Sequence, residues 1–413
     1  MKKVIIIGLV WPEPSSTGAG TRMLQLINLF KKQNYQIIFI SAAEKSEYSY
    51  DLIKTGVIEQ PITLNDSSFD SWISNENPDI VLFDRFMTEE QYGWRVSENC
   101  PKALKILDTE DLHCLRKVRQ DLFKKDIPFT IPKLKSSDIA KREIASMYRC
   151  DLSLLISSYE MDILMNEFSI DSSILFHLPF LLNRNELLQK SPGFINRKDF
   201  ICIGNFLHEP NYDAVLYLKQ EIWPLIRKKL PQARLKVFGA YPSQKVMQLH
   251  NEKQGFMVFG RANNALEELS KCRVNLAPLR FGAGLKTKLL EGMLSGTPSV
   301  TTKIGAEGFR YKEWNGFVTN NPIDFANYSV QLHQDEQLWG TKQKNAEVLL
   351  EQFTVKNYKE DFFNRLLEIA NKLENHRVSN FIGSMLQHHN QQSTKYMSKW
   401  IEEKNKNKPG SSS

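Results

Sequence analysis

Residues Arg280–Thr302, RFGAGLKTKLLEGMLSGTPSVTT, combine flexible backbone, positive charge and one carboxylate within a short segment. An apolar run precedes the segment and a β-branched run ends it, so we expect a strand, a glycine loop, a helix beginning near residue 285 and a second strand. Lys286 and Lys288 then fall in the first helical turn, beside backbone N–H groups that Gly284 leaves accessible. A diphosphate there would meet the partial positive charge of the helix and two ammonium groups.

The two lysines favour a ligand over a purely structural helix. A lysine in the first turn opposes the helix dipole, at a cost of about 0.3–1 kcal/mol each. Glu291 follows Lys288 by three residues on the same helix face, and its carboxylate can accept both hydroxyls of a ribose. The alternative for Glu291 is an ordinary Lys–Glu surface pair. The segment therefore predicts a site for the diphosphate and ribose of a sugar nucleotide.

Two further segments follow predicted strands and could approach a ligand through backbone. In Ser15–Arg22, SSTGAGTR, we expect a loop in which Gly18 and Gly20 precede a helix N-terminus. Gly204-Asn205 ends the strand FICIGNF. The alternatives are a surface turn for the first segment and a structural strand end for the second. A nicotinamide site is disfavoured, because no acidic residue closes the strand QIIFISAA.

Polar candidates for the opposite side of the site lie in DTEDLHCLRKVRQ, which follows the strand ALKIL. Ligands of open α/β sheets bind at the carboxyl ends of strands, so Asp108, Asp111 and His113 are expected at the ligand cleft. The alternative is helix capping by one of the aspartates, with an exposed His113.

The strands that must position these residues are short and apolar on both faces, as in parallel sheets covered by helices. They are KKVIIIGLV, QIIFISAA, DIVLFDR, ALKILDT and LSLLISS, and then FICIGNF, RLKVFGA, GFMVFGR, CRVNLAPL and TPSVTTK. Amphipathic helical patterns separate them, which predicts two doubly wound α/β domains in tandem. We expect an N-terminal domain over 1–190, a C-terminal domain over 191–352, a further helix over 353–373 and a frayed or disordered polar tail over 374–413.

Length and composition agree with two globular domains. The chain has 413 residues, of which 41% are hydrophobic and 24% charged. No apolar run approaches the roughly 20 residues that cross a bilayer. The segment MKKVIIIGLVWPEP has no small-residue cleavage site, so we interpret it as a buried strand rather than a signal peptide.

Cysteine content and charge limit the partners. The five cysteines include no C-x-x-C pair, which favours reduced thiols in a cytosolic protein and argues against a zinc site. The formal net charge of +7 suits an anionic small molecule and leaves contact with an anionic membrane surface open. Basic runs with interleaved aromatic residues are absent from the sequence, which argues against nucleic-acid binding.

Taken together, three segments resemble the retaining family-4 glycosyltransferases of the GT-B fold. They are IGNFLHEPNYDAVLYLKQEIWPLIRKKLPQARLKVFG, LAPLRFGAGLKTKLLEGMLSGTPSVTT and GAEGF, with a looser resemblance through GTRMLQLINLF and ILDTEDLHCLRKVRQ. The resemblance implies a C-terminal domain that holds a nucleotide-diphosphate sugar and an N-terminal domain that holds the acceptor. It also implies that residues 353–373 cross back to the first domain and that no metal or other cofactor is needed.

The resemblance further implies roles for individual residues. Glu291 would bind the ribose, and Lys286 or Lys288 would neutralise the leaving diphosphate. Gly204-Asn205 would approach the phosphates through backbone. His113, with Asp111 as the second choice, would touch the donor sugar or the acceptor hydroxyl.

The sequence departs from the family pattern at two places. Ala283 stands where many members carry a glutamate, eight positions before Glu291. Asn205 and Asn211 stand where many members carry Arg and Lys. Lys286 and Lys288 are expected to offset these losses, as in the subgroup with a G-x-G-x-K-x-K loop.

The leading hypothesis is a cytoplasmic hexosyltransferase that builds a surface polysaccharide or glycolipid on a hydroxyl acceptor, with the inner face of the membrane left open as its place of work. A sugar-nucleotide 2-epimerase of similar architecture is the second hypothesis. The third is a catalytically inactive glycosyltransferase-like subunit that binds a nucleotide or a partner.

Overall fold

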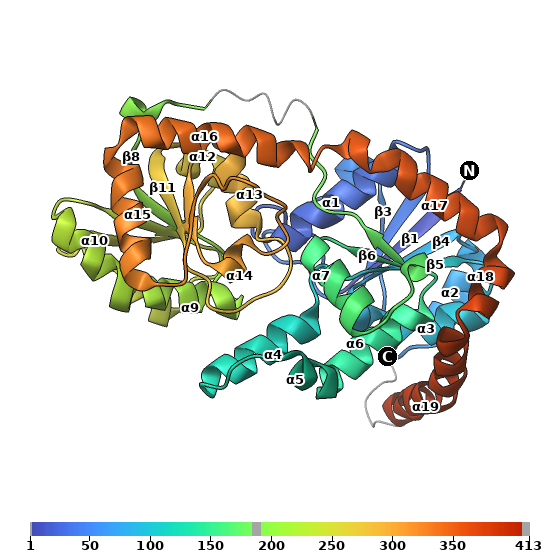
Figure 1. The fold of residues 1–413 in the computed structure, drawn as a ribbon. Coiled ribbons are helices and arrows are strands. Elements are labelled where there is room, and N and C mark those ends of the chain that lie inside the picture. The colour runs from blue at the N-terminus through green and yellow to red at the C-terminus, as the bar shows by residue number, and fades with distance from the viewer. Residues whose placement is uncertain (1, 184–190, 407–413) are drawn as a thin grey trace.

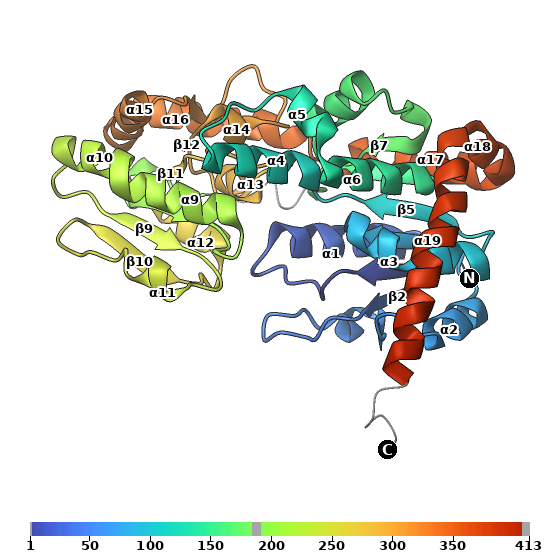
Figure 2. The same cartoon turned by 90° about the horizontal axis from the view of Figure 1, so that it is seen from below.

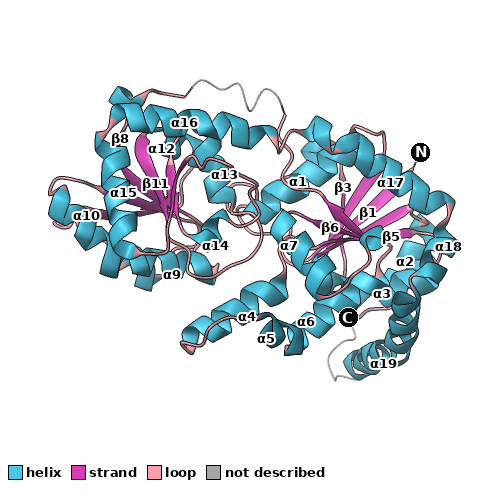
Figure 3. Ribbon diagram, viewed as in Figure 1, coloured by secondary structure: helices cyan, strands magenta, loops and turns pink. Residues whose placement is uncertain are grey.

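Short apolar runs of the chain form two parallel sheets. The first contains β1 Lys3–Gly8, β2 Gln36–Ser41, β3 Ile58–Pro61, β4 Ile80–Asp84, β5 Leu104–Asp108, β6 Leu152–Leu155 and β7 Leu175–His177. The second contains β8 Lys198–Ile203, β9 Leu235–Phe238, β10 Phe256–Gly260, β11 Cys272–Ala277, β12 Ser299–Thr301 and β13 Gly316–Val318. The computed structural model describes residues 2–183 and 191–406, and it confirms the predicted pair of Rossmann-like domains (Figures 1 and 3). The two domains face a central cleft, as predicted.

The sequence patterns predict all of these strands except β3, β7 and β13, each of which lies at the edge of its sheet. Edge strands have one neighbour and are only partly covered. β3 accordingly has no buried residue, and β7 and β13 have three residues each. β3 carries no apolar run that a sequence pattern could detect, and β7 and β13 are too short for a periodic pattern to identify them.

Alternate residues of the central strands point into different cores. Ile5 and Ile7 of β1 join the hydrophobic cluster on one face of the first sheet, while Val4 and Ile6 join the cluster on the other. Because both faces are covered, the strand is apolar throughout rather than alternating. β8 divides in the same way, with Phe200 in one cluster of the second sheet and Ile201 in another.

The candidate residues lie where the strand order of each sheet reverses, that is, where successive strands begin to be added on the other side. The orders are β3-β2-β1-β4-β5-β6-β7 and β10-β9-β8-β11-β12-β13, with every pair parallel. The chain turns outward in both directions from β1 and β4 in the first sheet, and from β8 and β11 in the second. Ligand crevices form beside the carboxyl ends of such strand pairs.

Helices cover both faces of each sheet (Figure 3). In the first lobe they are α1 Gly18–Lys31, α2 Ser68–Glu76, α3 Arg85–Asn99, α4 His113–Lys124, α5 Ile131–Ser136, α6 Asp138–Arg149 and α7 Ser158–Asp162. In the second they are α9 Glu209–Tyr217, α10 Trp223–Lys229, α11 Gln244–Met247, α12 Ala265–Ser270, α13 Thr287–Leu294, α14 Lys303–Ala306, α15 Pro322–Gln334 and α16 Glu336–Glu351. Within the described parts of the chain, no helix has the length and apolar character to span a membrane.

Two of the predicted domain boundaries concern the passage of the chain between the lobes. The expected boundary at residue 190 falls in 184–190, outside the described residues. The return passage leads from α16 to α17, Lys359–Asn371, which lies over the first lobe (Figure 1). Phe362, Leu366 and Ile369 of α17 are buried in the same cluster as Val4 and Ile6, so the expected returning helix packs on the first sheet.

The expectation of a frayed or disordered tail over 374–413 is wrong for residues up to 406, whereas 407–413 lie outside the described part. α18, Leu373–Ser379, and α19, Phe381–Lys406, follow α17 and pack on the first lobe (Figure 2). Arg377 donates to both carboxylate oxygens of Asp151 at 2.8 Å. Arg95 forms an ion pair with Glu402. Specific polar contacts order this polar segment, so its composition was misleading.

Candidate active site

A cleft with a volume of about 810 Å³ lies between the lobes, at the carboxyl ends of the central strands of both sheets. The loops after β1, β4, β5, β8 and β11 reach into it. The structure brings together in this cleft the following site residues that the sequence singled out: Gly18, Gly20, Asp111, His113, Gly204, Asn205, Gly284, Lys286, Lys288 and Glu291. The expectation that Asp108 lies there is wrong, because Asp108 is fully buried against Arg22.

The lysine-bearing helix α13 begins at Thr287, so Lys286 is its N-cap residue and only Lys288 lies in the first turn. Both lysines are 8% exposed. Burial lowers the pKa of Lys286 to about 8, with Glu307 opposing the shift and Arg119 adding to it. Burial also lowers the pKa of Lys288. Two poorly hydrated ammonium groups at a helix N-terminus would bind a diphosphate favourably.

The ammonium group of Lys288 lies at the end of β8. Its Nζ donates to Asn211 Oδ1 at 2.7 Å, and the Asn211 side-chain amide donates to Asn205 O at 2.8 Å. A Cβ built on Gly204 would lie 2.7 Å from Lys288 Nζ, so a larger residue at 204 would displace the lysine. Lys288 of α13 therefore brings a positive charge to the place where many members of the resembling family carry Arg and Lys and this chain has Asn205 and Asn211.

Glu291 lies one turn further along α13 and lines the same cleft. Burial raises the pKa of Glu291 to about 7, and Lys288 acts in the opposite direction. Lys288 is buried, and among the described residues its ammonium group donates a hydrogen bond to Asn211 rather than to Glu291. The surface Lys–Glu pair considered as the alternative is therefore not what the structure shows.

The N-terminus of α1 meets that of α13 across the cleft. α1 begins at Gly18, and the Thr17 side chain caps it by accepting from Gly20 N at 2.9 Å, so the expected glycine loop is wrong from Gly18 onward. A Cβ on Gly18 would lie 2.0 Å from Thr287 Oγ1. Neither helix has an acidic residue in its first turn. Two positive helix ends thus converge where glycine allows close approach.

Asp111 and His113 lie on the first-lobe side of the cleft. Arg116 Nε donates to Asp111 Oδ2 at 2.7 Å, and His113 Nε2 lies 3.4 Å from Asp111 Oδ1. Burial alone would raise the pKa of Asp111, but Arg116 and His113 together hold it well below its usual value. Burial lowers the pKa of His113 to about 4, so its ring is neutral at pH 7.

Neither part of the capping alternative holds in the structure. Leu112 is the N-cap residue of α4 and provides no side-chain bond, while Asp108 forms a buried ion pair with Arg22. The His113 side chain is only 15% exposed.

Three cleft residues that the sequence prediction missed follow β4 and β5 or end them: Asp84, Arg85 and Glu110. Arg85 and Glu110 have left-handed φ angles of 70° and 62°, which side chains other than glycine seldom adopt. Arg85 Nε lies 3.6 Å from Asp84 Oδ1. Glu110 is 8% exposed, and its Oε1 has no partner among the described residues. Burial, with Asp108 adding to it, raises the pKa of Glu110.

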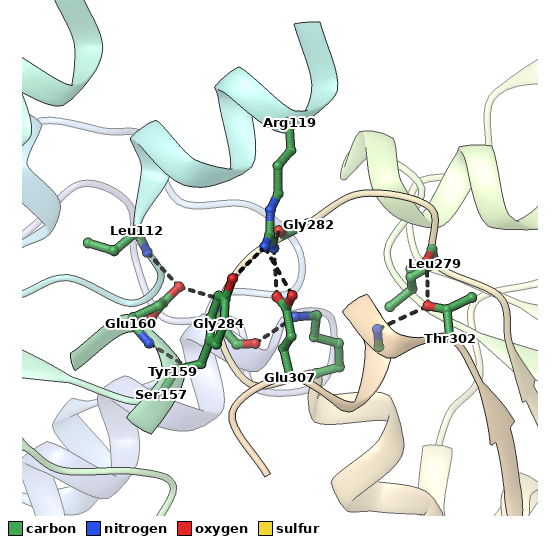
Figure 4. Close-up of polar contacts among 12 residues, drawn as sticks. Leu112, Arg119, Ser157, Tyr159, Glu160, Leu279, Gly282, Gly284, Thr302 and Glu307 are labelled. Carbon is green, nitrogen blue, oxygen red and sulfur yellow. Dashed lines mark hydrogen bonds and ion pairs between the residues drawn. The ribbon is translucent and has the colours of Figure 1, made fainter. Parts of the chain in front are cut away.

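Polar contacts join the lobes along one edge of the cleft (Figure 4). Glu160 Oε1 accepts from Leu112 N at 3.0 Å in the first lobe and from Gly284 N at 2.7 Å in the second. Arg119 donates to Glu307 at 2.6 and 3.0 Å and to Gly282 O at 2.9 Å. These contacts hold the glycine loop before α13 against the first lobe.

Comparison with known proteins agrees with this geometry. Residues 197–335 match the family model described as "Glycosyl transferases group 1". Among curated protein sequences, none matches the chain. Several solved structures share the fold at low sequence identity.

TarM from S. aureus, solved with Fondaparinux, α-GlcNAc-glycerol and UDP, has a TM-score of 0.67 at 12% identity, covering 90% of this chain and 100% of that one. HepE from Anabaena, solved with UDP and glucose, has a TM-score of 0.64 at 16% identity, covering 89% and 99%. The pneumococcal O-GlcNAc transferase GtfA, solved with UDP and GlcNAc, has a TM-score of 0.67 at 11% identity, covering 89% and 99%.

The structure has the GT-B fold of these proteins, and residues 197–335 match a glycosyltransferase family model. The part that carries the family match is the second lobe, which contributes Gly204, Lys286, Lys288 and Glu291 to the cleft.

Proposed function

We propose that this protein transfers a sugar from a nucleotide-diphosphate sugar to a hydroxyl acceptor of a glycan or glycolipid, without a metal ion and with retention at the anomeric carbon. The observation that carries the proposal is the convergence of the N-termini of α1 and α13 with the buried ammonium group of Lys288. This arrangement supplies the positive charge that a departing diphosphate requires.

The donor would lie along α13. Its diphosphate would lie at Gly204 and Lys288, and the ribose hydroxyls would bond the Glu291 carboxylate one turn further on. Lys286, whose Nζ donates to Gly284 O at 2.7 Å, would add charge from the loop side. UDP is the first nucleotide to test, because TarM, HepE and GtfA were each solved with it.

The acceptor would enter from the first lobe. Glu110 Oε1 and Asp84 Oδ1 are buried and have no hydrogen-bond partner among the described residues, although Arg85 forms an ion pair with Asp84, so they suit a ligand that donates hydrogen bonds, as hydroxyl groups do. His113 would contact the donor sugar or the attacking hydroxyl, and the Asp111–Arg116 pair would position it.

Retention is proposed from the resemblance to the retaining glycosyltransferases, and the protonation behaviour of His113 and Asp111 is compatible with it. Inversion requires a general base with a pKa near the working pH. The pKa of His113 is lowered to about 4 by burial, and that of Asp111 is held low by Arg116. Neither side chain suits that task at neutral pH.

A donor panel tests the proposal directly. UDP-, GDP- and ADP-sugars are incubated with the protein, with and without EDTA, and nucleotide release and the anomeric configuration of the products are measured. We expect slow release of one nucleoside diphosphate, unchanged by EDTA, and a product with the anomeric configuration of the donor. Release that EDTA abolishes would contradict metal independence, and an inverted product would contradict retention. An epimerised donor would support the epimerase, and binding without turnover would support an inactive subunit.

The pKa of Glu291 leads to a pH dependence of donor binding. Ribose binding favours the ionised carboxylate, which in the free protein is formed only as the pH rises through about 7. Affinity for UDP-glucose, whose diphosphate does not titrate in this range, should therefore rise roughly tenfold between about pH 5.5 and about pH 7.5. Isothermal titration calorimetry at a series of pH values measures the effect.

Two variants serve as controls. Glu291→Gln should remove the rise, because the amide does not ionise. Glu143→Gln should keep it, since burial also raises the pKa of Glu143 to about 7, but its carboxylate bonds the backbone N–H groups of His113 and Cys114 outside the cleft. A rise that persists in Glu291→Gln would remove Glu291 from the ribose site.

A further inference from the structure

The last helix, α19, packs on the protein through its small and polar residues. It runs along the outer edge of the first lobe, against α3 and α6 (Figure 2). Among the residues of α19 whose burial is described, Gly383 and Ser398 are the buried ones. A Cβ on Gly383 would lie 2.1 Å from Tyr148 O, so the helices are in close contact there. Ser398 Oγ donates to Asn65 Oδ1 at 3.1 Å, and Glu402 pairs with Arg95.

The opposite face of α19 is apolar and faces solvent. The large side chains on it are Phe381 73%, Ile382 47%, Met385 45%, Tyr396 63%, Met397 60% and Trp400 59% exposed. At 3.6 residues per turn, these positions fall within an arc of about 160°. A surface helix of a globular protein normally turns its apolar face inward, and α19 does the reverse. In this stripe the apolar side chains form two groups, one at Phe381–Met385 and one at Tyr396–Trp400, and exposed apolar groups on one helix face indicate a binding surface.

The charges beside the stripe indicate what covers it. Lys399 and Lys404 are exposed, and Lys404 Nζ lies 5.0 Å from the centre of the Trp400 ring. Residues 381–400 contain no aspartate or glutamate; the two acidic residues of α19 are Glu402, which pairs with Arg95, and the exposed Glu403. In a pair of α19 helices from two copies, a parallel arrangement would place lysine against lysine. An antiparallel arrangement would place the lysines against the start of the helix, which has no acidic residue. A second copy of α19 therefore offers the lysines little opposite charge in either arrangement.

Anionic lipid headgroups would complement these lysines. Tryptophan and tyrosine side chains favour the boundary between headgroups and acyl chains, where their polar tips stay hydrated. We propose that α19 docks the protein on an anionic membrane surface, lying in the plane of the interface with its Phe381-to-Trp400 stripe in the headgroup–acyl boundary. This inference does not depend on the proposed reaction.

Vesicle flotation of the full-length chain tests the proposal. The probes are phosphatidylcholine vesicles with and without about one quarter phosphatidylglycerol, at low and high salt. We expect binding to the anionic vesicles that high salt weakens, and little binding to the neutral ones. Met397→Ser with Trp400→Ser should lower the partition coefficient by about tenfold or more, because two large apolar side chains no longer leave water.

Matched controls are Ile195→Ser and Val348→Ser, which alter side chains that are 77% and 73% exposed on the second lobe and should leave binding unchanged. Circular dichroism and thermal unfolding verify that each variant is folded. Failure of the wild-type chain to bind anionic vesicles would overturn the proposal. So would a concentration-dependent dimer that the double α19 variant abolishes, since that result assigns the face to a second copy. Neither outcome bears on the donor-panel experiment.

Discussion

Lys286→Met combined with Lys288→Met is expected to lower turnover by about 10²–10³-fold while weakening donor binding much less. Charge on the diphosphate grows as the bond to the sugar breaks, so a preorganised ammonium group stabilises the transition state more than the ground state. Methionine keeps the length and apolar stem of lysine and removes only the charge. Single-turnover kinetics, with donor affinity measured separately, distinguishes the two effects.

The single variants and a surface control refine this test. Lys288→Met should have the larger effect, because Lys288 Nζ lies against Gly204 and Asn211, whereas Lys286 Nζ bonds the carbonyl of Gly284 in its own loop. Lys303→Met changes an exposed lysine of the same lobe and should have no effect. Equal losses in turnover and affinity would show that the lysines serve ground-state binding alone.

Arg22→Met should destabilise the first lobe by about 3–5 kcal/mol, because it leaves a buried carboxylate without its cation. Arg22 and Asp108 are both 0% exposed, and Arg22 Nη2 donates to Asp108 Oδ1 at 3.1 Å. Arg22 Nη1 also donates to Pro179 O at 2.6 Å. The guanidinium thus fixes α1 against the end of β5. Urea unfolding followed by circular dichroism measures the loss.

A second substitution tests the cause of that loss. Adding Asp108→Asn to Arg22→Met removes the unpaired charge and should restore a large part of the stability. A single variant within about 1 kcal/mol of the wild type would show that this ion pair contributes little to stability. Gly18 lies at the start of the same helix and meets Thr287, so donor binding should weaken in the single variant as well.

The two lobes build the site jointly. The second lobe supplies the two lysines and Glu291 from the start and the first turns of α13. The first lobe supplies the facing helix end, His113 and carboxylate oxygens of Asp84 and Glu110 that have no hydrogen-bond partner among the described residues. The hydrogen bond from Gly284 N to Glu160 and the Arg119–Glu307 ion pair hold the glycine loop before α13 in place between the two lobes. Donor and acceptor would therefore meet at the line where the lobes touch.

The sequence by itself determined the features that short segments encode. The central strands are apolar throughout because both faces of a parallel sheet are buried, so their runs are visible without a structure. Lys286, Lys288 and Glu291 could be assigned together because a single helix fixes their relative positions. Because ligands of open α/β sheets bind at the carboxyl ends of strands, the sequence also predicts Asp111, His113 and Gly204 at the cleft, although the same rule is wrong for Asp108.

Tertiary structure alone decided the contacts that join distant segments. Arg22 and Asp108 are 86 residues apart, and Arg119 and Glu307 are 188 apart, so no local pattern pairs them. Whether Lys286 is a buried cation of lowered pKa or a solvated one depends on how the two lobes close over it.

The polar C-terminal segment shows the same division between sequence and structure. Its composition predicts a loose tail, yet α19 is ordered by Ser398 and Glu402 meeting Arg95 and exposes its apolar stripe. Periodicity reports which residues share a face of a helix. Which face is buried depends on the surface that the helix meets, and the rest of the fold creates that surface.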